Sequence, residues 1–400
     1  MTEWIKTLRI SSAPRYIPLV AGVEFVRSAL MLVLLPTLGV HFLGLSMAVV
    51  GIAISAHYLF DNALRPFFGY LADAIGAKAL LSGGLLISSA AMVLMVASRS
   101  PLALIFSTAL FGIGASSLWP VVISRLTREV EEGERAKSLS TIYATWMIAS
   151  GCGTVLASSL TRTSLTVALP ILTAVILASG TYALIIKMER SSGVSFHFSR
   201  IMQHWRKDWR TLLLHLQASK WLFPGMYVQT LAMGLLIPVL SPYARLVLHD
   251  RPTQITVALL LVGGAAVGTL PLFGRFVDRW GSRPFLIVGY LGAGVSLAFF
   301  TLQTKFWTAM IAFLFAGIFY AMILPAWNSV LDQAVSEEWR AAMWGFFMMV
   351  EGLGTATGPL FSGELWVVGG PHAPFWGTAI IVTLMAGIYT LLRHPALVRR

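Results

Sequence analysis

Apolar stretches of about 20 residues recur along the whole chain and alternate with short polar segments. Each stretch is long enough to cross a hydrocarbon core of about 30 Å as a helix. The pattern predicts twelve spans, near residues 16–41, 47–72, 79–97, 102–125, 138–160, 163–186, 221–246, 253–275, 284–302, 306–331, 341–365 and 374–393. The predicted fold class is therefore an all-α integral membrane protein with twelve transmembrane helices.

The basic residues are distributed unevenly between the two sides of these spans. If the N-terminus lies inside, 22 of the 29 Lys and Arg residues fall in inside segments and five fall outside. Cytoplasmic loops are enriched in Lys and Arg, so we expect both termini in the cytoplasm. The net charge of +12 then reflects orientation and contact with anionic membrane lipids, and it does not indicate a nucleic-acid partner.

The longest polar segment, residues 187–220, divides the chain into a bundle over 1–186 and a second over 221–400. Hydrophobic residues recur in this segment at helical spacing, at Ile201, Trp205, Trp209, Leu212 and Leu216, with basic residues between them. This pattern favours an amphipathic helix on the inner membrane surface, and a solvated basic linker is the alternative.

The two predicted bundles carry the same loop pattern. "GYLADAIGAK" follows the second span and "GRFVDRWGSR" follows the eighth. The matching residues, all 205 positions apart, are Gly69, Asp73, Gly76 and Lys78 in the first copy and Gly274, Asp278, Gly281 and Arg283 in the second. Pro120 and Pro325 share the offset. Repeated matches at one offset indicate two six-helix pseudo-repeats.

The loop pattern G-x-x-x-D-R-x-G-x-R resembles the signature loop of the major facilitator superfamily. Arg279 keeps the arginine of that pattern, whereas Ala74 replaces it in the first copy. The stretch "GLGTATGPLFSG", residues 352–363, also resembles the Gly-Pro motif of antiporters in that superfamily. The resemblance implies two halves that rock around a midplane site, with the two signature loops as gating elements.

Ionisable residues lie deep inside predicted spans, where charges are costly and usually functional. Glu24 and Arg27 are three residues apart and share a helix face, whereas His57, Asp61 and Arg65 form a stripe of one residue per turn. One interpretation is a charge network that only locks spans one and two together. The other is a proton-coupling site, in which rocking separates an arginine from a carboxylate that then takes up a proton.

Aromatic and polar residues inside the spans suggest candidate substrate contacts, because flat aromatic faces stack on sugar or apolar rings. Interfacial belts are the default explanation for many of them. The candidates are Trp119, Tyr143, Trp146, Gln229, Trp327, Asn328 and Glu351, with Trp344 near them. Glu351 stands alone in span eleven and is either a second protonation site or a polar contact. Because spans seven to nine offer little polarity beyond Gln229, an amphiphilic substrate is expected.

Several segments together resemble one branch of the superfamily. "EFVR", "AHYLFDNA", "WLFPGMYVQ" and "LPAWNSV" occur in matching order along the chain. They are similar to proton-coupled flippases that move a diglucosyl-diacylglycerol anchor for lipoteichoic acid synthesis in Gram-positive bacteria. This resemblance implies a charged relay at Glu24, Arg27 and Asp61 and a headgroup cavity lined by Trp119 and Trp146. It also implies proton antiport in a bacterial cytoplasmic membrane.

Two other classes of function are alternatives for this sequence. A proton-driven multidrug or small-molecule exporter of the same fold would also use acidic residues in an aromatic cavity. An enzyme is not expected, because the chain has no GK[ST] phosphate loop, no H-E-x-x-H and no G-x-S-x-G. We expect no metal, no cofactor beyond the proton gradient, and a monomer among membrane lipids. The single cysteine, Cys152, allows no internal disulfide.

Overall fold

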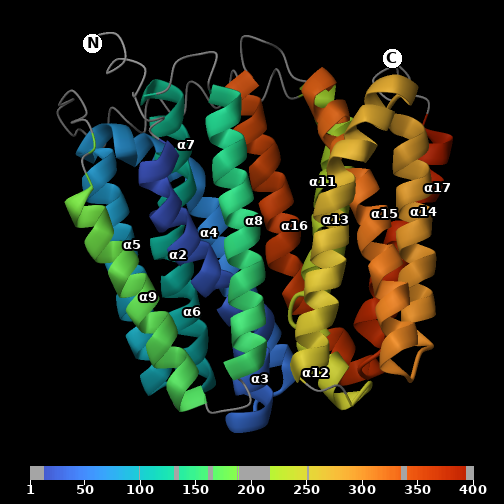
Figure 1. Cartoon of the computed structure of the whole chain (residues 1–400), viewed down its shortest axis with the longest axis horizontal. Helices are drawn as coiled ribbons and strands as arrows, with labels where there is room; N and C mark the ends of the chain where they lie inside the picture. The colour runs from blue at the N-terminus through green and yellow to red at the C-terminus, as the bar shows by residue number, and fades with distance from the viewer. Residues whose placement is uncertain are drawn as a thin grey trace, which may run out of the picture. The chain divides into compact units, whose positions relative to one another are not determined.

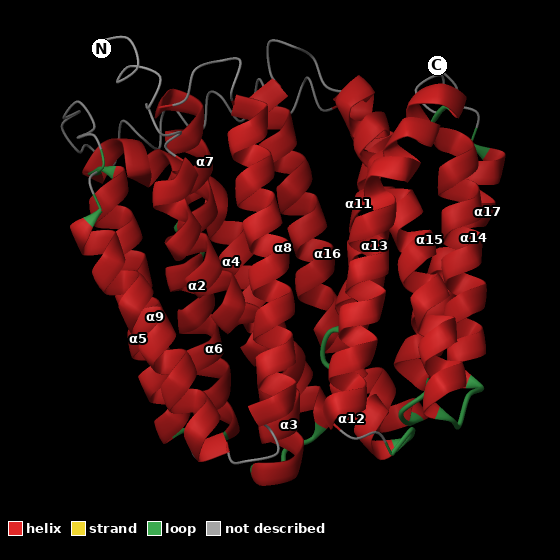
Figure 2. Ribbon diagram, in the orientation of Figure 1, coloured by secondary structure: helices red, strands yellow, loops and turns green. Residues whose placement is uncertain are grey.

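The computed structural model of the chain describes residues 13–98, 100–129, 135–160, 165–186, 188, 217–249, 252–334 and 340–392. Within these ranges every regular element is a helix and no strand occurs (Figure 2). Ten helices are long and apolar enough to cross a membrane by length and composition. Helices α8 and α16, with 26 and 30 residues, are also long enough but contain many Ser, Thr and Gly residues. The prediction of an all-α membrane protein is therefore confirmed.

Contacts divide the chain into two compact units, Met1–Leu34 with Leu59–Phe198 and Leu35–Tyr58 with Ser199–Arg400. The first unit holds α2 (Ala13–Ser28), the π-helix η1 (Ala29–Leu34), α5 (Ala77–Ala97), α6 (Pro101–Ala115), α7 (Leu118–Glu129), α8 (Arg135–Leu160) and α9 (Leu165–Ile185). Helix α4 (Met47–Ile75) is continuous and contributes its first part to the second unit and its second part to the first.

The second unit holds the remaining helices, and Figure 1 labels the α-helices among them. They are α3 (Leu35–Thr37), the π-helix η2 (Leu38–Phe42), the 3-10 helix η4 (Gln217–Leu222), α11 (Phe223–Leu236), α12 (Leu240–Leu246), α13 (Pro252–Trp280), α14 (Ser282–Thr301), α15 (Phe306–Ala334), α16 (Arg340–Gly369) and α17 (Ala373–Leu391). Most of the predicted linker, 187–220, lies outside the described residues, so its amphipathic helix and the division it makes stay predictions.

Helices pack in the same order within each unit. In the first unit α2 packs on α8 and α9, and α5 packs on α6 and α9. In the second unit α11 packs on α16 and α17, and α14 packs on α15 and α17. Counted along the chain, these are corresponding spans of the two six-helix repeats. The repeat that the 205-residue offset predicts is thus also a repeat of helix packing.

Small residues allow the helices of each pair to approach closely, as is common in membrane proteins. A Cβ atom on Gly84 of α5 would lie 2.6 Å from the carbonyl oxygen of Gly114 on α6. On α11, a Cβ on Gly234 would lie 2.9 Å from the Cα of Gly358 on α16. Both helix pairs therefore contact through backbone atoms, and a side chain at these glycines would push them apart.

The first part of α4 packs inside the second unit. Met47 is buried in a cluster with Val239, Tyr243 and Phe375. A Cβ on Gly363 of α16 would lie 2.8 Å from the Cα of Ala48. The contacts of the stretch Leu35–Tyr58 therefore place it in the same unit as the C-terminal helices. Nothing in the sequence marks this division.

The two signature loops share one backbone conformation. Gly76 and Gly281 precede α5 and α14 with φ of 94° and 79°, values that residues with a Cβ atom rarely adopt. After the second loop, Arg283 donates from Nε to the Tyr389 carbonyl at 3.2 Å and from Nη2 to the Thr390 carbonyl at 2.6 Å. This guanidinium satisfies carbonyls at the C-terminal end of α17, where a positive charge is favourable.

The other residues of the signature loops are less constrained. Lys78, Asp278 and Arg279 are exposed, and the side chain of Asp73 lies outside the description. A Cβ on Gly69 would reach Pro120 only at 3.9 Å, and one on Gly274 would meet no atom within 4 Å. The gating role of these loops stays a prediction.

The close contact of α5 and α6 can be tested with two neighbouring glycines. A Cβ on Gly83 would meet nothing within 4 Å, in contrast to Gly84. Gly83→Ala should raise the free energy of unfolding by up to about 1 kcal/mol, because alanine is the better helix former. Gly84→Ala should lower it despite that gain, because its Cβ meets the Gly114 carbonyl. Thermal unfolding in detergent measures both, and equal effects would contradict the packing described.

Candidate functional site

Four ionisable side chains of the first unit form one buried network. Glu24 and Arg27 come from α2, and Asp61 and Arg65 come from α4. Arg27 Nη1 lies 2.9 Å from Glu24 Oε1, and Arg27 Nη2 lies 3.6 Å from Asp61 Oδ1. Arg65 Nη2 lies 2.6 Å from Asp61 Oδ2. Two carboxylates and two guanidinium groups thus neutralise one another inside predicted membrane spans.

Helix geometry explains why these residues meet. Positions three and four apart share a face, so Arg27 reaches back to Glu24 and Arg65 reaches back to Asp61. The Glu24 and Asp61 side chains are 2% and 0% exposed, whereas the Arg65 side chain is 22% exposed. Arg27 is therefore the group that joins the two helices, and Arg65 lies at the more accessible end.

His57 lies one turn before Asp61 on α4 and is fully buried. Its ring packs edge-on against Tyr58, with centroids 5.0 Å apart. His57 belongs by its contacts to the second unit, whereas Asp61 belongs to the first. The stripe predicted from the sequence thus lies on one helix, and the chain boundary between the two units falls between His57 and Asp61.

Aromatic rings lie directly beside the network in the first unit. Trp119 of α7 donates its indole N–H to Glu24 Oε1 at 2.8 Å. The Trp119 ring stacks on Tyr143 at 5.6 Å and meets Trp146 edge-on at 6.4 Å. Tyr143 and Trp146 on α8 are about 40% exposed, whereas Trp119 is 8% exposed. Flat aromatic faces thus lie next to a carboxyl group that accepts a hydrogen bond from one of the rings.

The second unit contains an apolar cavity of about 200 Å³. Most of its lining is small or aliphatic, including Ala232, Val262, Gly263, Leu297, Ala316 and Val382. Its main polar feature is the hydrogen bond from the Tyr290 hydroxyl to Gln229 Oε1, at 2.6 Å. Such a cavity suits an apolar chain or ring, with one polar pair available for orientation.

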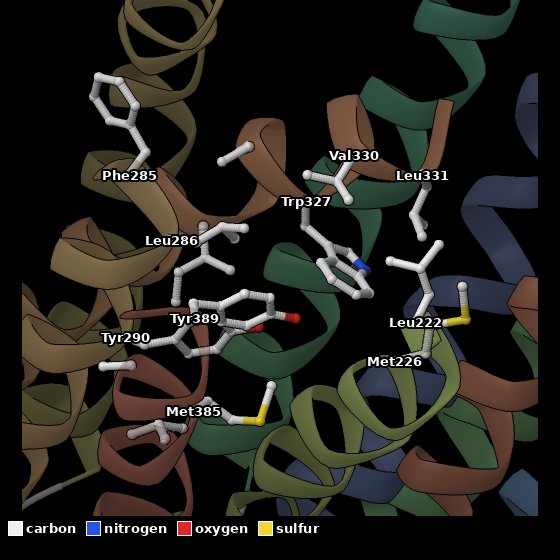
Figure 3. Close-up of a cluster of buried hydrophobic side chains, with 14 of the residues drawn as sticks. Leu222, Met226, Phe285, Leu286, Tyr290, Trp327, Val330, Leu331, Met385 and Tyr389 are labelled. Carbon is white, nitrogen blue, oxygen red and sulfur yellow. The ribbon is translucent and has the colours of Figure 1, made fainter. Parts of the chain in front are cut away.

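The other predicted substrate residues differ in how buried they are. Trp327 is 1% exposed and donates its indole N–H to Glu351 Oε1 at 3.1 Å. Asn328 is exposed and is not among the residues that line the cavity. The side chain of Trp344 lies outside the description. Trp327 packs in a core with Met226, Tyr290 and Tyr389 (Figure 3).

Sequence reasoning missed the tyrosines of this unit. Tyr290 bonds Gln229 and stacks on Tyr389 with ring centroids 5.6 Å apart. Tyr227 of α11 bonds Thr357 of α16 at 2.8 Å. Each tyrosine lies in an apolar span where nothing in the sequence distinguishes it from a core aromatic residue.

Among the described residues, no group of three or more His, Cys, Asp or Glu side chains could hold a metal ion.

A polytopic helical repeat with a buried ion-pair network is typical of membrane transport proteins. The chain belongs to the Major Facilitator Superfamily, whose family model matches residues 19–249 and 222–400.

The chain is similar to several known transport proteins. The chain is 26% identical over 357 residues to the proton-coupled antiporter flippase LtaA of Staphylococcus aureus strain MSSA476, a match covering 86% of each chain. It has the fold of the nucleoside transporter NupG, with a TM-score of 0.74, 14% identity and coverage of 96% of this chain and 99% of NupG. It also resembles the D-xylose-proton symporter, with the same TM-score and identity and coverage of 97% and 99%.

The charge balance of the network yields a stability test. Asp61→Asn leaves two guanidinium groups facing one carboxylate, and breaking a buried ion pair costs about 3–5 kcal/mol. We expect a loss near the lower end, because Arg65 is partly exposed. Adding Arg65→Gln restores neutrality and should recover part of the loss. Thermal unfolding in detergent compares the two single variants with the double variant, and a double variant no more stable than Asp61→Asn would contradict the charge balance.

Proposed function

We propose that the protein is a proton-coupled antiporter that flips an amphiphilic glycolipid across the bacterial cytoplasmic membrane. The observation that carries this proposal is the position of Arg27, whose guanidinium faces Glu24 and Asp61 at once. Intramembrane ionisable groups of this kind mark proton relays and substrate paths in transporters. The similarity to a proton-coupled antiporter flippase supports the same function.

The network offers a route for coupling. A proton that binds Asp61 removes the negative charge that holds Arg65 and faces Arg27. Arg27 then has Glu24 as its remaining carboxylate partner in the network. Because α2 and α4 carry the two ends of this interaction, a change in protonation alters how strongly the two helices are held together. Alternating access would use that change to couple proton entry to substrate movement.

Two surfaces support this substrate class. The exposed faces of Tyr143 and Trp146 suit sugar rings. The apolar cavity of the second unit suits acyl chains. A glycolipid has both parts, and the sequence resemblance points to a diglucosyl-diacylglycerol. On this proposal the proton gradient is the only driving force, both termini are cytoplasmic, and the protein works as a monomer without catalysis.

Gradient-driven flipping tests the proposal. The protein is placed in proteoliposomes that contain a fluorescent diglucosyl-diacylglycerol, and a pH gradient is imposed. A chemical quencher added outside then measures the fraction of the labelled lipid in each leaflet. The parent should flip the lipid faster with the gradient than without it. Glu24→Gln and Asp61→Asn should abolish that difference, because each removes a carboxylate that would exchange a proton.

Two controls separate the alternatives. Glu364→Gln changes an exposed acid on α16 and should respond to the gradient like the parent. If the pH gradient instead drives a lipophilic cationic dye while the glycolipid stays in place, the protein is a small-molecule exporter of the same fold. If Glu24→Gln and Asp61→Asn both keep the gradient response, the coupling role of the network is wrong.

A further inference from the structure

Glu351 lies in the middle of α16, far along the chain from the charge network of the first unit. Its carboxylate accepts one hydrogen bond, from the Trp327 indole at 3.1 Å. Thr355, one turn later, donates to the backbone carbonyl of Glu351 and not to its side chain. Among the described residues, Glu351 forms no ion pair with a Lys, Arg or His side chain, in contrast to Glu24 and Asp61.

Tyrosines lie near Glu351 on the neighbouring helices. Tyr290 on α14 and Tyr320 on α15 are within electrostatic range of its carboxyl group. Tyr389 on α17 stacks on Tyr290, and Tyr227 on α11 bonds Thr357 of α16. Figure 3 shows Trp327 together with Tyr290 and Tyr389 in this part of the unit. The first part of α4 also packs on α16 and carries His57, whose ring lies against Tyr58.

Each unit thus contains a hydrogen bond from an indole to a glutamate side chain, but the charged groups beside the two glutamates differ. Trp119 bonds Glu24 at 2.8 Å, and Trp327 bonds Glu351 at 3.1 Å. Glu24 also pairs with the Arg27 guanidinium, so a cation lies beside it. Glu351 has the indole without the guanidinium. A carboxylate inside a membrane with no cation beside it costs less free energy when it binds a proton than when it stays charged.

We propose that Glu351 is a second proton-binding site, held as the carboxylic acid in the conformation described here. In the acid form its carbonyl oxygen accepts the Trp327 N–H, and its hydroxyl becomes a donor. Glu351 is only partly buried, so it keeps a route for proton exchange. Its part in transport rests on the proposed proton coupling, whereas its protonation state does not.

Carbodiimide labelling reads that state directly. Dicyclohexylcarbodiimide takes the proton of a carboxylic acid in an apolar site, and the carboxylate oxygen then adds to its central carbon. The O-acylisourea rearranges to a stable N-acylurea, so the reagent is added whole and nothing leaves. In the purified full-length protein at neutral pH, mass spectrometry should find the adduct on Glu351. Glu24 and Asp61, which are paired with arginines, should remain unlabelled.

An infrared measurement removes the dependence on reagent access. The difference spectrum between the parent and Glu351→Gln should lose one band in the carbonyl region of protonated carboxylic acids. Glu364→Gln, on the same helix but exposed, should leave that band in place. If Glu351→Gln also loses only ionised carboxylate intensity, the proposal is overturned, whatever the labelling gives.

Transport then separates this inference from the proposed function. In proteoliposomes with the fluorescent glycolipid, Glu351→Gln should lower the number of protons moved per lipid by one, with Glu364→Gln unchanged. A parent protein without any gradient response would refute the proposed function and leave the infrared result to decide the protonation of Glu351. An unchanged proton number in Glu351→Gln would overturn the role of Glu351 as a transported-proton site.

Discussion

Inside a membrane a charge is tolerated when an opposite charge lies beside it, and the arrangement of the first unit depends on that constraint. Arg27 meets it for two helices, because its guanidinium faces Glu24 on its own helix and Asp61 on α4. The Trp119 indole adds a neutral hydrogen bond to the same Glu24 oxygen that pairs with Arg27. The aromatic cluster, the ion pairs and the contact of the two helices are therefore parts of one electrostatic arrangement.

The two units share helix packing but differ in chemistry. Both use left-handed glycines, Gly76 and Gly281, before their third helix, and both pack that helix on the fourth and the sixth. The first unit places ionised groups on its first two helices. The second places an apolar cavity and a carboxylate without a cation partner among the described residues. Duplication preserved the frame, and the side chains inside it diverged toward a polar half and an apolar half.

Local spacing made some of this predictable from the sequence. The span pattern gave the helices, and the three- and four-residue spacings gave the pairs of Arg27 with Glu24 and of Arg65 with Asp61. The hydrogen bond from Trp119 to Glu24 joins residues 95 positions apart, and no local pattern reports such a contact. For the same reason the sequence does not distinguish Tyr290, whose hydroxyl bonds Gln229 across 61 positions. Tertiary placement decides these cases, and side-chain type alone does not.

The first span contains two stretches of π-helix, η1 and η2, on either side of the three-residue α3 with Pro36. A π-turn holds one more residue than an α-turn, and such turns are frequent at functional sites. If one wide turn tightened to an α-turn, it would release a residue and rotate the following segment by roughly 100°. The first span thus holds its extra residue in a wide turn that begins two residues after Arg27, so a tightening of that turn would change the face that the following segment presents.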